Sequence, residues 1–397
     1  MNRVLVLGAG KIGALIAGLL AESGDYDIFL GDARPGVAAD VATAHRQQAG
    51  PRQGKAGIVE ALDLDATDGT ALTAALRAHG ITAIVSSLPY YCNEAVAAVA
   101  RAAGTHYFDL TEDVRSAGAV LRIARGADTT FAPQCGLAPG FISIAAAELI
   151  RHFDSVRTVK LRVGALPQHP NNVLKYSLTW STEGLINEYG NLCHSVVNGE
   201  LREVLPLEGL EEIAIDGTSY EAFNTSGGLG SLAESFGRDV ETMDYKTIRY
   251  PGHCEQMQLL MNGLKLNQDR DTLKRILENS VPQTLQDVII VYAAVTGLQE
   301  GELREENYVN KVYPQVIGGR LWSAIQITTA AGICAVLDTV LRDPARYRGF
   351  VRQEQFALAD ILANRFGQYY ANGAGKEVSA RVIAAGDRGR QRSHDHA

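Results

Sequence analysis

The sequence predicts an α/β protein in which an open, doubly wound parallel sheet is followed by an α+β domain, with C-terminal helices that return to the first domain. Over residues 1–135, short apolar runs rich in β-branched residues alternate with Ala-rich helical stretches, which is the pattern of βαβ units. A glycine-rich turn follows the first apolar run. After about residue 153, polar and apolar residues alternate along the strand-like runs, as in half-exposed strands.

The strands of the first domain are expected at 3–7, 26–32, 57–64, 81–89, 105–111 and 129–135. The first run, RVLVL, suits a strand that is buried on both faces of a parallel sheet. Helices are expected between these strands, one of them ending near residue 23 and the next beginning near residue 37.

The first domain is expected to span 1–135, and the α+β domain 136–318, with the strand-like runs VRTVKLRVGAL, EEIAIDG and YKTIRYPG. The run RLWSAIQITTAAGICAVLDTVLR then opens a helical segment, 319–371, which we expect to pack on the first domain. The Gly-, Arg- and His-rich tail at 372–397 is expected to be disordered. We interpret His394 and His396 as tail residues rather than metal ligands.

The composition excludes some partners. The chain has 397 residues and a formal net charge of −8, which argues against nucleic acid or an anionic membrane as a partner, since phosphates require a basic face. Its five cysteines are dispersed without CxxC spacing, a pattern typical of a reducing compartment. No signal peptide or uninterrupted membrane-length apolar run is evident, so we expect a cytoplasmic protein.

The turn GAGKIG has the context that a dinucleotide site requires. It follows a buried strand, opens a helix, and is matched by Asp32 at the end of the next strand. This is the fingerprint of the Rossmann fold, in which the glycines allow the tight turn and close approach of a pyrophosphate. Asp32 favours NAD over NADP, while Arg34 leaves NADP open. The alternative is a glycine-rich turn without a ligand. The expected cofactor-binding residues here are Gly8, Gly10, Lys11, Ile12, Gly13, Asp32, Ala33 and Arg34.

Polar residues follow three later strands, at the edge of the sheet where ligands bind in doubly wound folds. SSLPYY places Ser87, Leu88, Pro89 and Tyr90 there, FDLTED places Asp109 and Glu112, and PQCGLAPG places Cys135. We interpret Cys135 as a small thiol lining the cofactor pocket, because no histidine motif accompanies it as a base and no further ligands form a metal site. The candidates for acid–base work are Tyr90, Asp109, Glu112, Lys175, Glu183 and His253.

Six motifs, in order, resemble the saccharopine dehydrogenase and lysine 6-dehydrogenase family: GAGKIG, SSLPYY, FDLTEDV, CGLAPGF, LKYSLTWSTEGLINEY and YKTIRYPGH. The resemblance covers about residues 1–370 and implies oxidation of the C–N bond of an amino acid with NAD or NADP. It also implies a second domain that carries the substrate site and mediates homodimer formation. By this resemblance Tyr176, Trp180, Arg249 and His253 are candidates for the substrate pocket. Together with the polar residues named above, the substrate-binding candidates are Tyr90, Lys175, Tyr176, Trp180, Glu183 and Arg249, and the catalytic candidates are Asp109, Glu112 and His253.

Arg249 is our candidate for binding a substrate carboxylate, since a guanidinium can form a bidentate fork. Two departures from the glutamate-forming saccharopine dehydrogenases favour lysine as substrate. Ala138 stands where those enzymes typically have an aspartate, and Glu183 would suit an ammonium better than the three carboxylates of saccharopine.

Three alternatives remain open. The first is saccharopine itself, held by a cationic cluster of Arg162, Lys175, Lys246 and Arg320. The second is a reductive polyamine-precursor synthesis, which is the same chemistry run backwards. The third is a non-catalytic NAD-binding protein.

Overall fold

The computed structural model describes residues 1–49, 57–371 and 380–383. The chain forms two compact units. The first unit comprises Met1–Glu148, Gln315–Trp322 and Gln326–Asn372, and the second comprises Leu149–Pro314, Ser323–Ile325 and Gly373–Ala397. The tail expected to be disordered, 372–397, lies outside the described residues apart from 380–383.

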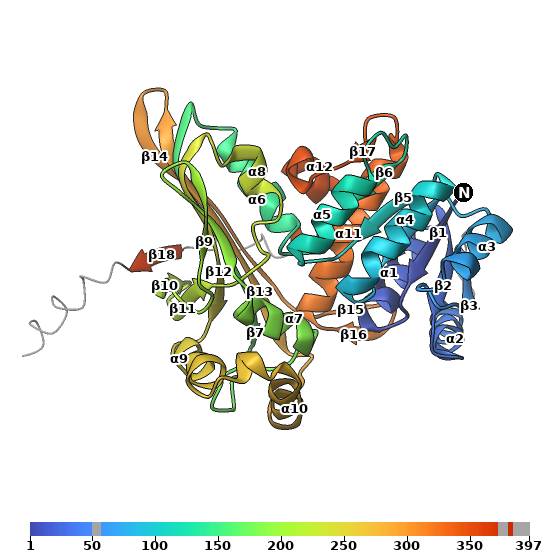
Figure 1. Ribbon diagram of the computed structural model, residues 1–397, viewed down its shortest axis with the longest axis horizontal. Helices are drawn as coiled ribbons and strands as arrows, with labels where there is room; N and C mark the ends of the chain where they lie inside the picture. The colour runs from blue at the N-terminus through green and yellow to red at the C-terminus, as the bar shows by residue number, and fades with distance from the viewer. Residues whose placement is uncertain (50–56, 372–379, 384–397) are drawn as a thin grey trace, which may run out of the picture. The chain divides into compact units, whose positions relative to one another are not determined.

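The first unit is built on a parallel sheet of seven strands in the order β17-β6-β5-β4-β1-β2-β3 (Figure 1). Its strands are β1 (Asn2–Leu7), β2 (Tyr26–Asp32), β3 (Val59–Asp63), β4 (Ala83–Ser86), β5 (His106–Asp109), β6 (Thr130–Ala132) and β17 (Gly349–Phe350). The strand order reverses between β1 and β4, as in a doubly wound sheet. This confirms the predicted Rossmann architecture, to which the short strand β17 is an unpredicted addition.

Helices connect these strands, and their sequences account for their ends. They are α1 (Lys11–Glu22), α2 (Val37–Ala49), α3 (Gly69–His79), α4 (Asn93–Ala103) and α5 (Val114–Ile123), and α6 (Phe141–Ile150) follows β6 and precedes β7 (Ser155–Pro167) in the chain. Asp68 and Asp113 cap α3 and α5 by accepting backbone N–H groups. Gly80 and Gly104 end α3 and α4 in the left-handed conformation. Val4, Leu5 and Val6 of β1 are wholly buried, as expected for a central strand covered on both faces.

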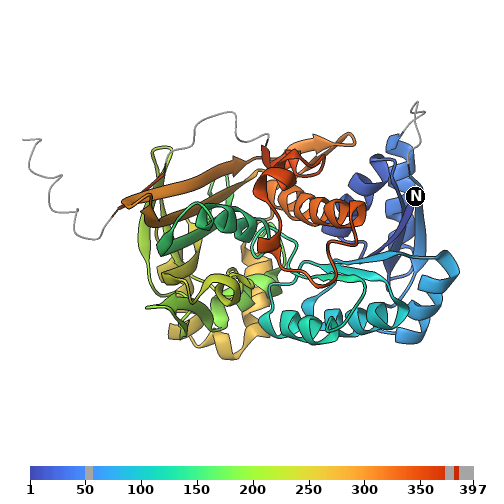
Figure 2. The same ribbon diagram turned by 90° about the horizontal axis from the view of Figure 1, so that it is seen from above.

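The predicted return of a C-terminal helix is confirmed for α11 (Ala324–Arg342), whose residues from Gln326 belong to the first unit. Its buried Asp338 accepts hydrogen bonds from the Tyr26 hydroxyl at 2.7 Å and from Asn364 Nδ2 at 2.8 Å. Figures 1 and 2 show α11 beside the parallel sheet. In the chain it is followed by α12 (Leu358–Ala363) and α13 (Gln368–Ala371). Among the described residues α11 alone is long and apolar enough to span a membrane, but 78% of its most apolar window is buried, as in a core helix.

The helix was expected to include RLW, and that expectation is wrong. Arg320–Trp322 forms strand β16, which pairs with β15 (Gln315–Ile317) across a glycine turn. Helix α11 begins only at Ala324 because Asp287 caps it there, accepting the N–H groups of Ala324 and Ile325 at 2.6 and 2.9 Å.

The second unit is built on a mixed sheet of nine strands, in which β12 and β7 are parallel and the other pairs are antiparallel. The main order is β14-β13-β7-β12-β11-β10-β18, and the hairpin of β8 and β9 joins β12 at its side. The strands are β7 (Ser155–Pro167), β8 (Cys193–Val197), β9 (Glu200–Val204), β10 (Glu211–Ile215), β11 (Thr218–Asn224), β12 (Val240–Arg249), β13 (Asp287–Gln299), β14 (Glu302–Val312) and β18 (Ala380–Ile383). This is the α+β domain that the alternating pattern predicts.

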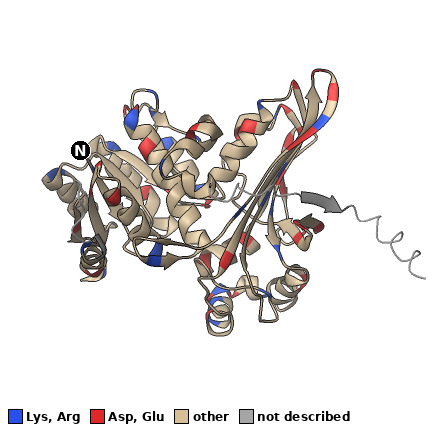
Figure 3. Cartoon of the chain, turned by 180° about the vertical axis from the view of Figure 1, so that it is seen from behind, with Lys and Arg blue, Asp and Glu red and all other residues tan. Residues whose placement is uncertain are grey.

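Helices α7 (Thr182–Gly190), α9 (His253–Gln258) and α10 (Arg270–Ser280) share one apolar core with β11, to which Tyr189, Phe223 and Leu273 contribute. The short helix α8 (Leu232–Phe236) lies between β11 and β12 in the chain. Acidic and basic residues are interspersed over both units (Figure 3), so the net negative charge does not gather into one face in this view.

Candidate active site

The glycine loop between β1 and α1 has the geometry of a pyrophosphate site. Gly8 has φ +93°, and a Cβ on Gly13 would clash with the Gly8 carbonyl oxygen, so both positions require glycine. A Cβ on Gly10 would meet no atom within 4 Å, so the space in front of this residue is open. No side chain caps the first turn of α1. The loop therefore leaves a helix N-terminus available to an anion.

Asp32, at the end of β2, is held on this loop. It accepts the Ala9 N–H at 2.9 Å and the Arg34 N–H at 3.0 Å. Arg34 also donates from Nε and Nη2 to the two carboxylate oxygens, at 3.0 and 3.1 Å. The hydrogen bonds from Arg34 lower the pKa of Asp32 to about 2, so the carboxylate is ionised near neutral pH. Ala33 is exposed beside the pair.

The end of β4 lies against the same loop. A Cβ on Gly8 would come within 2.9 Å of the Ser87 carbonyl oxygen and 3.3 Å of Leu88. Pro89 and Tyr90 follow in a short turn, and the Tyr90 carbonyl accepts the Ser116 hydroxyl at 3.2 Å. The structure therefore brings the predicted residues of SSLPYY next to the glycine fingerprint, where a dinucleotide chain would pass.

Asp109 ends β5 and ties neighbouring segments together. It is 0% exposed and accepts the Thr111 N–H, the Gln134 N–H and the Tyr107 hydroxyl at 2.9, 3.0 and 2.9 Å. Burial raises its pKa to about 6, although these hydrogen bonds oppose the shift. The catalytic role expected for Asp109 does not fit this position, because its oxygens are enclosed and already occupied. Its role is to hold the ends of β5 and β6 together.

Glu112, three residues further on, is half-buried and remains the acid–base candidate of this unit. Burial, with the charges of Asp113 and Asp109, raises its pKa. A carboxyl group whose pKa moves toward neutrality is suited to proton transfer.

Cys135 is 1% exposed and its thiol lies 3.0 Å from the Ala132 carbonyl oxygen, while Gln353 Nε2 donates to it at 3.2 Å. Burial and the charge of Asp109 raise the pKa of this thiol well above its usual value, so it is not a nucleophile. The thiol is enclosed rather than lining a pocket, which differs from the role predicted for it. All five cysteines are buried free thiols.

In the second unit, a buried cluster surrounds Arg249. The residue is 2% exposed, and its Nε donates to the Tyr189 hydroxyl at 2.8 Å and its Nη1 to the Ile248 carbonyl at 2.9 Å. Its guanidinium carbon lies 4.9 Å from the centroid of the Tyr176 ring. Burial disfavours the charge, but Tyr189, Tyr176 and Glu188 raise the Arg249 pKa. Within the described residues no carboxylate forms an ion pair with Arg249, so the buried Glu188 compensates its charge only at longer range.

His253 belongs to the same cluster but does not suit the base role expected for it. Its Nε2 lies 3.0 Å from the Tyr189 hydroxyl and its Nδ1 2.7 Å from the Leu174 carbonyl oxygen. Burial and the charge of Arg249 lower the His253 pKa to about 3. A neutral, fully bonded imidazole holds Tyr189 in place instead.

The remaining residues of the predicted substrate site divide into two groups. Tyr176 is buried and accepts a hydrogen bond from Trp180 Nε1 at 3.0 Å, and the Trp180 indole packs where a Cβ on Gly184 would clash. Lys175 is exposed and donates to the Pro251 carbonyl at 2.8 Å. Glu183 is exposed and forms an ion pair with Lys274 at 2.6 Å, so its carboxylate already has a cation.

Two residues of the cationic cluster expected for saccharopine, Arg162 and Lys246, are already paired with carboxylates. Arg162 and Lys246 lie together on the sheet, where Glu211 and Asp244 form ion pairs with both. Arg320 belongs to the β15–β16 hairpin of the first unit, with its guanidinium 4.4 Å from the centroid of the Trp322 ring. Two of the four expected cations are thus neutralised within the fold.

Comparison with known proteins identifies the family. The model of the saccharopine dehydrogenase NADP-binding domain matches residues 4–130, and that of the saccharopine dehydrogenase C-terminal domain matches residues 136–368. The chain belongs to the saccharopine dehydrogenase family. This confirms the predicted family and establishes an NAD(P)-binding oxidoreductase of that family, in which the glycine loop and Asp32 fit a nicotinamide dinucleotide.

A solved structure shares the fold of this saccharopine dehydrogenase family member. Apo saccharopine dehydrogenase (L-Glu forming) from Saccharomyces cerevisiae is 16% identical over 97% of this chain and 100% of that chain, with a TM-score of 0.73. At this identity the likeness shows the fold alone. A putative myo-inositol dehydrogenase from Sinorhizobium meliloti 1021 is 12% identical over 97% and 100% of the two chains, with a TM-score of 0.44.

Sequence reasoning did not single out two residues that the structure adds to the family site. Tyr189 connects Arg249 to His253, and its only signal was its place at the end of the motif LKYSLTWSTEGLINEY. Glu221 accepts the N–H groups of Gly252 and Cys254 at 2.7 and 2.6 Å, which fixes the start of α9. No local pattern marks Glu221, since its partners lie about thirty residues away.

Proposed function

We propose that this protein oxidises the C–N bond of an amino acid that carries a single carboxylate group, and that its substrate is lysine, oxidised at the ε-carbon. The observation that supports this most is Arg249, a buried guanidinium without a direct carboxylate partner among the described residues. A buried charge is costly unless it is paired. A substrate carboxylate would supply the missing partner through a charge-assisted fork.

The same observations favour lysine over saccharopine. Saccharopine has three carboxylates, but Arg162 and Lys246 are neutralised by Glu211 and Asp244 and have no charge left for a ligand. Ala138 also favours lysine, because the motif CGLAPGF has alanine where glutamate-forming saccharopine dehydrogenases typically have an aspartate. Glu183 adds less support than expected, because Lys274 already pairs with it.

In this proposal the chain's own groups position the substrate and move protons. Arg249 binds the carboxylate, and Tyr189 and Tyr176 hold the guanidinium in place. Glu112 accepts a proton from the substrate ammonium before the hydride leaves. It then acts as general base on the water that hydrolyses the resulting imine to aldehyde and ammonia. The bound nicotinamide supplies the hydride acceptor.

The preferred cofactor in this proposal is NAD, with NADP tolerated. Asp32 is ionised and faces the region where the ribose hydroxyls bind, which disfavours a 2′-phosphate. Arg34 partly offsets that charge through its two side-chain hydrogen bonds.

We also propose that the protein is a cytoplasmic homodimer that binds neither nucleic acid nor membranes. The five free buried thiols and the frequency of two-fold oligomers support this, and light scattering after size exclusion measures the assembly.

The proposal is tested by the absorbance of the reduced nicotinamide. Purified protein receives NAD or NADP with lysine, saccharopine or a diamine in separate reactions. Lysine alone should produce reduced cofactor. Signal with saccharopine alone would assign the family's other activity to this chain, and signal with the diamine alone would assign polyamine-type chemistry.

The Arg249→Gln variant then tests the site. Removing the charged fork should lower kcat/KM for lysine by at least about tenfold, since a hydrogen bond between charged groups is worth at least that factor. Affinity for NADH should not change, because the dinucleotide residues belong to the first unit. Arg202→Gln is the matched control, since Arg202 is exposed and forms a surface ion pair with Glu200. Unchanged turnover in Arg249→Gln would remove Arg249 from the substrate site.

A further inference from the structure

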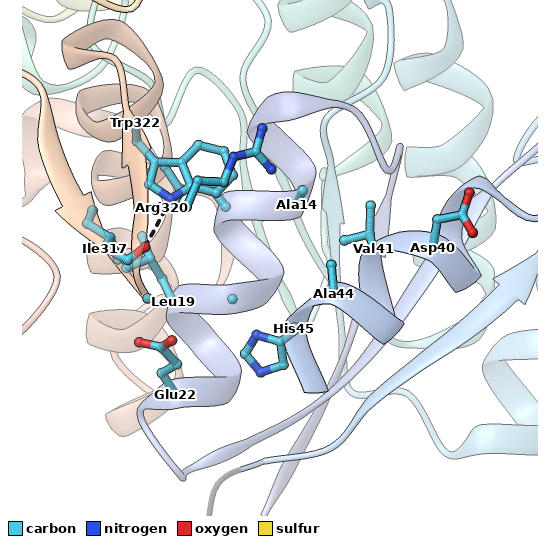
Figure 4. Close-up of a pocket in the computed structure, with 13 residues that line it drawn as sticks. Ala14, Leu19, Glu22, Asp40, Val41, Ala44, His45, Ile317, Arg320 and Trp322 are labelled. Carbon is cyan, nitrogen blue, oxygen red and sulfur yellow. Dashed lines mark hydrogen bonds between the residues drawn. The ribbon is translucent and has the colours of Figure 1, made fainter. Parts of the chain in front are cut away.

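A second cavity lies in the first unit and shares no lining residue with the glycine loop or the strand ends described above. Its volume is about 240 Å³. It is lined by α1, α2 and the β15–β16 hairpin and is open on one side (Figure 4). The lining runs from Ala14 to Glu22 on α1 and from Asp40 to His45 on α2. The dinucleotide site does not account for this space.

The floor of the cavity contains a glycine that packing does not explain. Gly18 lies in the interior of α1, where glycine costs roughly 1 kcal/mol relative to alanine. Close packing elsewhere in the unit forces glycine, as at Gly13, but a Cβ on Gly18 would meet only His45 Nδ1 at 3.8 Å, an ordinary contact distance. The helix therefore accepts a poorer helix former at a position that leaves the floor open. Ala14 and Ala44, beside it in the lining, also have small side chains that leave the cavity open.

The hairpin supplies a cation at one side of the cavity. Register places Arg320 opposite Ile317 and Trp322 opposite Gln315, so Arg320 and Trp322 share one face of the hairpin. The indole donates to the Ile317 carbonyl at 3.3 Å, and the guanidinium of Arg320 lies 4.4 Å from the ring centroid. In the part of the chain that the structure describes, Arg320 forms no ion pair. Its exposed guanidinium is thus held over an aromatic ring with its donors available to an anion.

Acidic side chains lie on the other sides. Figure 4 shows Asp40 on α2 across the cavity from Arg320, with Ala14 and Val41 between them. Glu22 lies at the far end of α1 from Ala14. A molecule lying on this apolar floor meets a positive group at one side and a negative group at another.

We propose that this cavity is a binding site for an ω-amino carboxylate, an aliphatic chain with a carboxylate at one end and an ammonium at the other, the class that includes the basic amino acids. Arg320 binds the carboxylate, Asp40 binds the ammonium, and the methylene chain covers Ala14, Gly18 and Val41. The inference stands on this cavity alone and holds whichever substrate the enzyme oxidises.

The probe is 6-aminohexanoate, titrated into the full chain by calorimetry. A ligand of this size is expected to bind with a dissociation constant on the order of 1 mM. Hexanoate and pentylamine, which each keep one charge, should bind at least about tenfold more weakly, since each loses a charged hydrogen-bonded contact. If hexanoate bound as tightly as 6-aminohexanoate, the site would not recognise the ammonium, and the proposal of a site for both charged ends would be wrong. The absence of saturable heat with 6-aminohexanoate up to about 20 times that constant would overturn the proposal as a whole.

Three variants locate the site. Arg320→Gln should weaken binding at least about tenfold, while Arg77→Gln, an exposed arginine of the same unit, should not change it. Ala44→Leu should abolish binding by filling the cavity from a position exposed to it. Gly18→Ala should weaken binding while raising Tm by about 2 °C, because alanine is the better helix former.

The same titrations distinguish this cavity from the substrate cluster around Arg249. If Arg249→Gln abolished the heat and Arg320→Gln left it unchanged, 6-aminohexanoate would be binding at that cluster and the proposal would be wrong. A Gly18→Ala variant that is more stable and binds as tightly as the parent would show that the glycine is unrelated to a ligand, and would also count against the site.

Discussion

Replacing Arg34 by Ala is expected to change cofactor selectivity in one direction. In the structure, Nε and Nη2 of Arg34 hold the two carboxylate oxygens of Asp32 at 3.0 and 3.1 Å, so the pair carries no net charge. An NADP 2′-phosphate would approach Arg34 and this neutral pair. In Arg34→Ala it would approach a bare carboxylate, and it would lose the N–H donors that the guanidinium offers.

The magnitude follows from two hydrogen bonds that the Arg34 guanidinium, which has five N–H donors, would make to the phosphate. Each hydrogen bond between charged groups is worth about tenfold or more in affinity, so the dissociation constant for NADPH should rise about 100-fold. NADH has no phosphate at this position, and its ribose hydroxyls no longer compete with Arg34 for Asp32. Its dissociation constant should therefore change by no more than about threefold.

The assay is a titration of NADH and NADPH fluorescence on the protein without substrate, so that turnover does not enter. Asp32→Asn is the opposing variant, which should weaken NADH and spare NADPH because it removes the repelling charge. Arg77→Ala controls for the loss of an exposed arginine elsewhere in the unit. Equal weakening of NADH and NADPH in Arg34→Ala would show that Arg34 only supports the loop, and would refute this account of selectivity.

Three further predictions concern the strand ends. The pKa of Asp109 is raised from 3.8 to about 6 in the folded protein, so stability from this group is present below pH 4 and lost as pH rises through 6. Two pH units at about 1.4 kcal/mol each make this about 3 kcal/mol. The free energy of unfolding in urea should thus fall less between pH 4 and 7 in Asp109→Asn than in the parent. An equal fall in both proteins would show that Asp109 is not the group responsible. Glu112→Gln should lower kcat about 100-fold and remove the acidic limb of the pH profile of kcat without changing the affinity for NADH. An unchanged acidic limb would show that Glu112 is not the general base. Cys135→Ser should keep most turnover, and a loss of more than about tenfold with NADH binding intact would show that the thiol takes part in catalysis.

Strands β1 to β6 could be predicted because each is a short, mainly apolar run bounded by glycine, proline or polar residues, whereas the two-residue strand β17 was not predicted. The observed strands fall within or very near the expected ranges, as β2 shows with bounds of Tyr26–Asp32. The hairpin of β15 and β16 was missed, although its glycine pair is a turn signal. The reason is that RLW runs directly into the apolar sequence of α11, and the cap that separates them comes from Asp287, 37 residues before Ala324.

The site was harder to predict, because a residue's role depends on partners far away in the sequence. His253 looked like a base from its motif, yet burial and the charge of Arg249 lower its pKa to about 3. Asp109 looked catalytic from its place at a strand end, yet its oxygens accept three hydrogen bonds inside the fold. Neither burial nor hydrogen bonding at these positions can be read from composition or spacing.

Two buried arginines of the second unit show what the fold itself requires and what it does not. Arg162 is enclosed with Glu211 and Asp244, so its charge is compensated by the protein and serves the sheet. Arg249 is almost equally buried, but it donates to a phenol and a carbonyl, and two tyrosine rings flank it. A fold that needed only stability would gain from a carboxylate or an apolar residue there, since an incompletely paired buried charge is costly. The asymmetry between the two arginines is therefore the strongest physical reason to expect an anionic group of the substrate at Arg249.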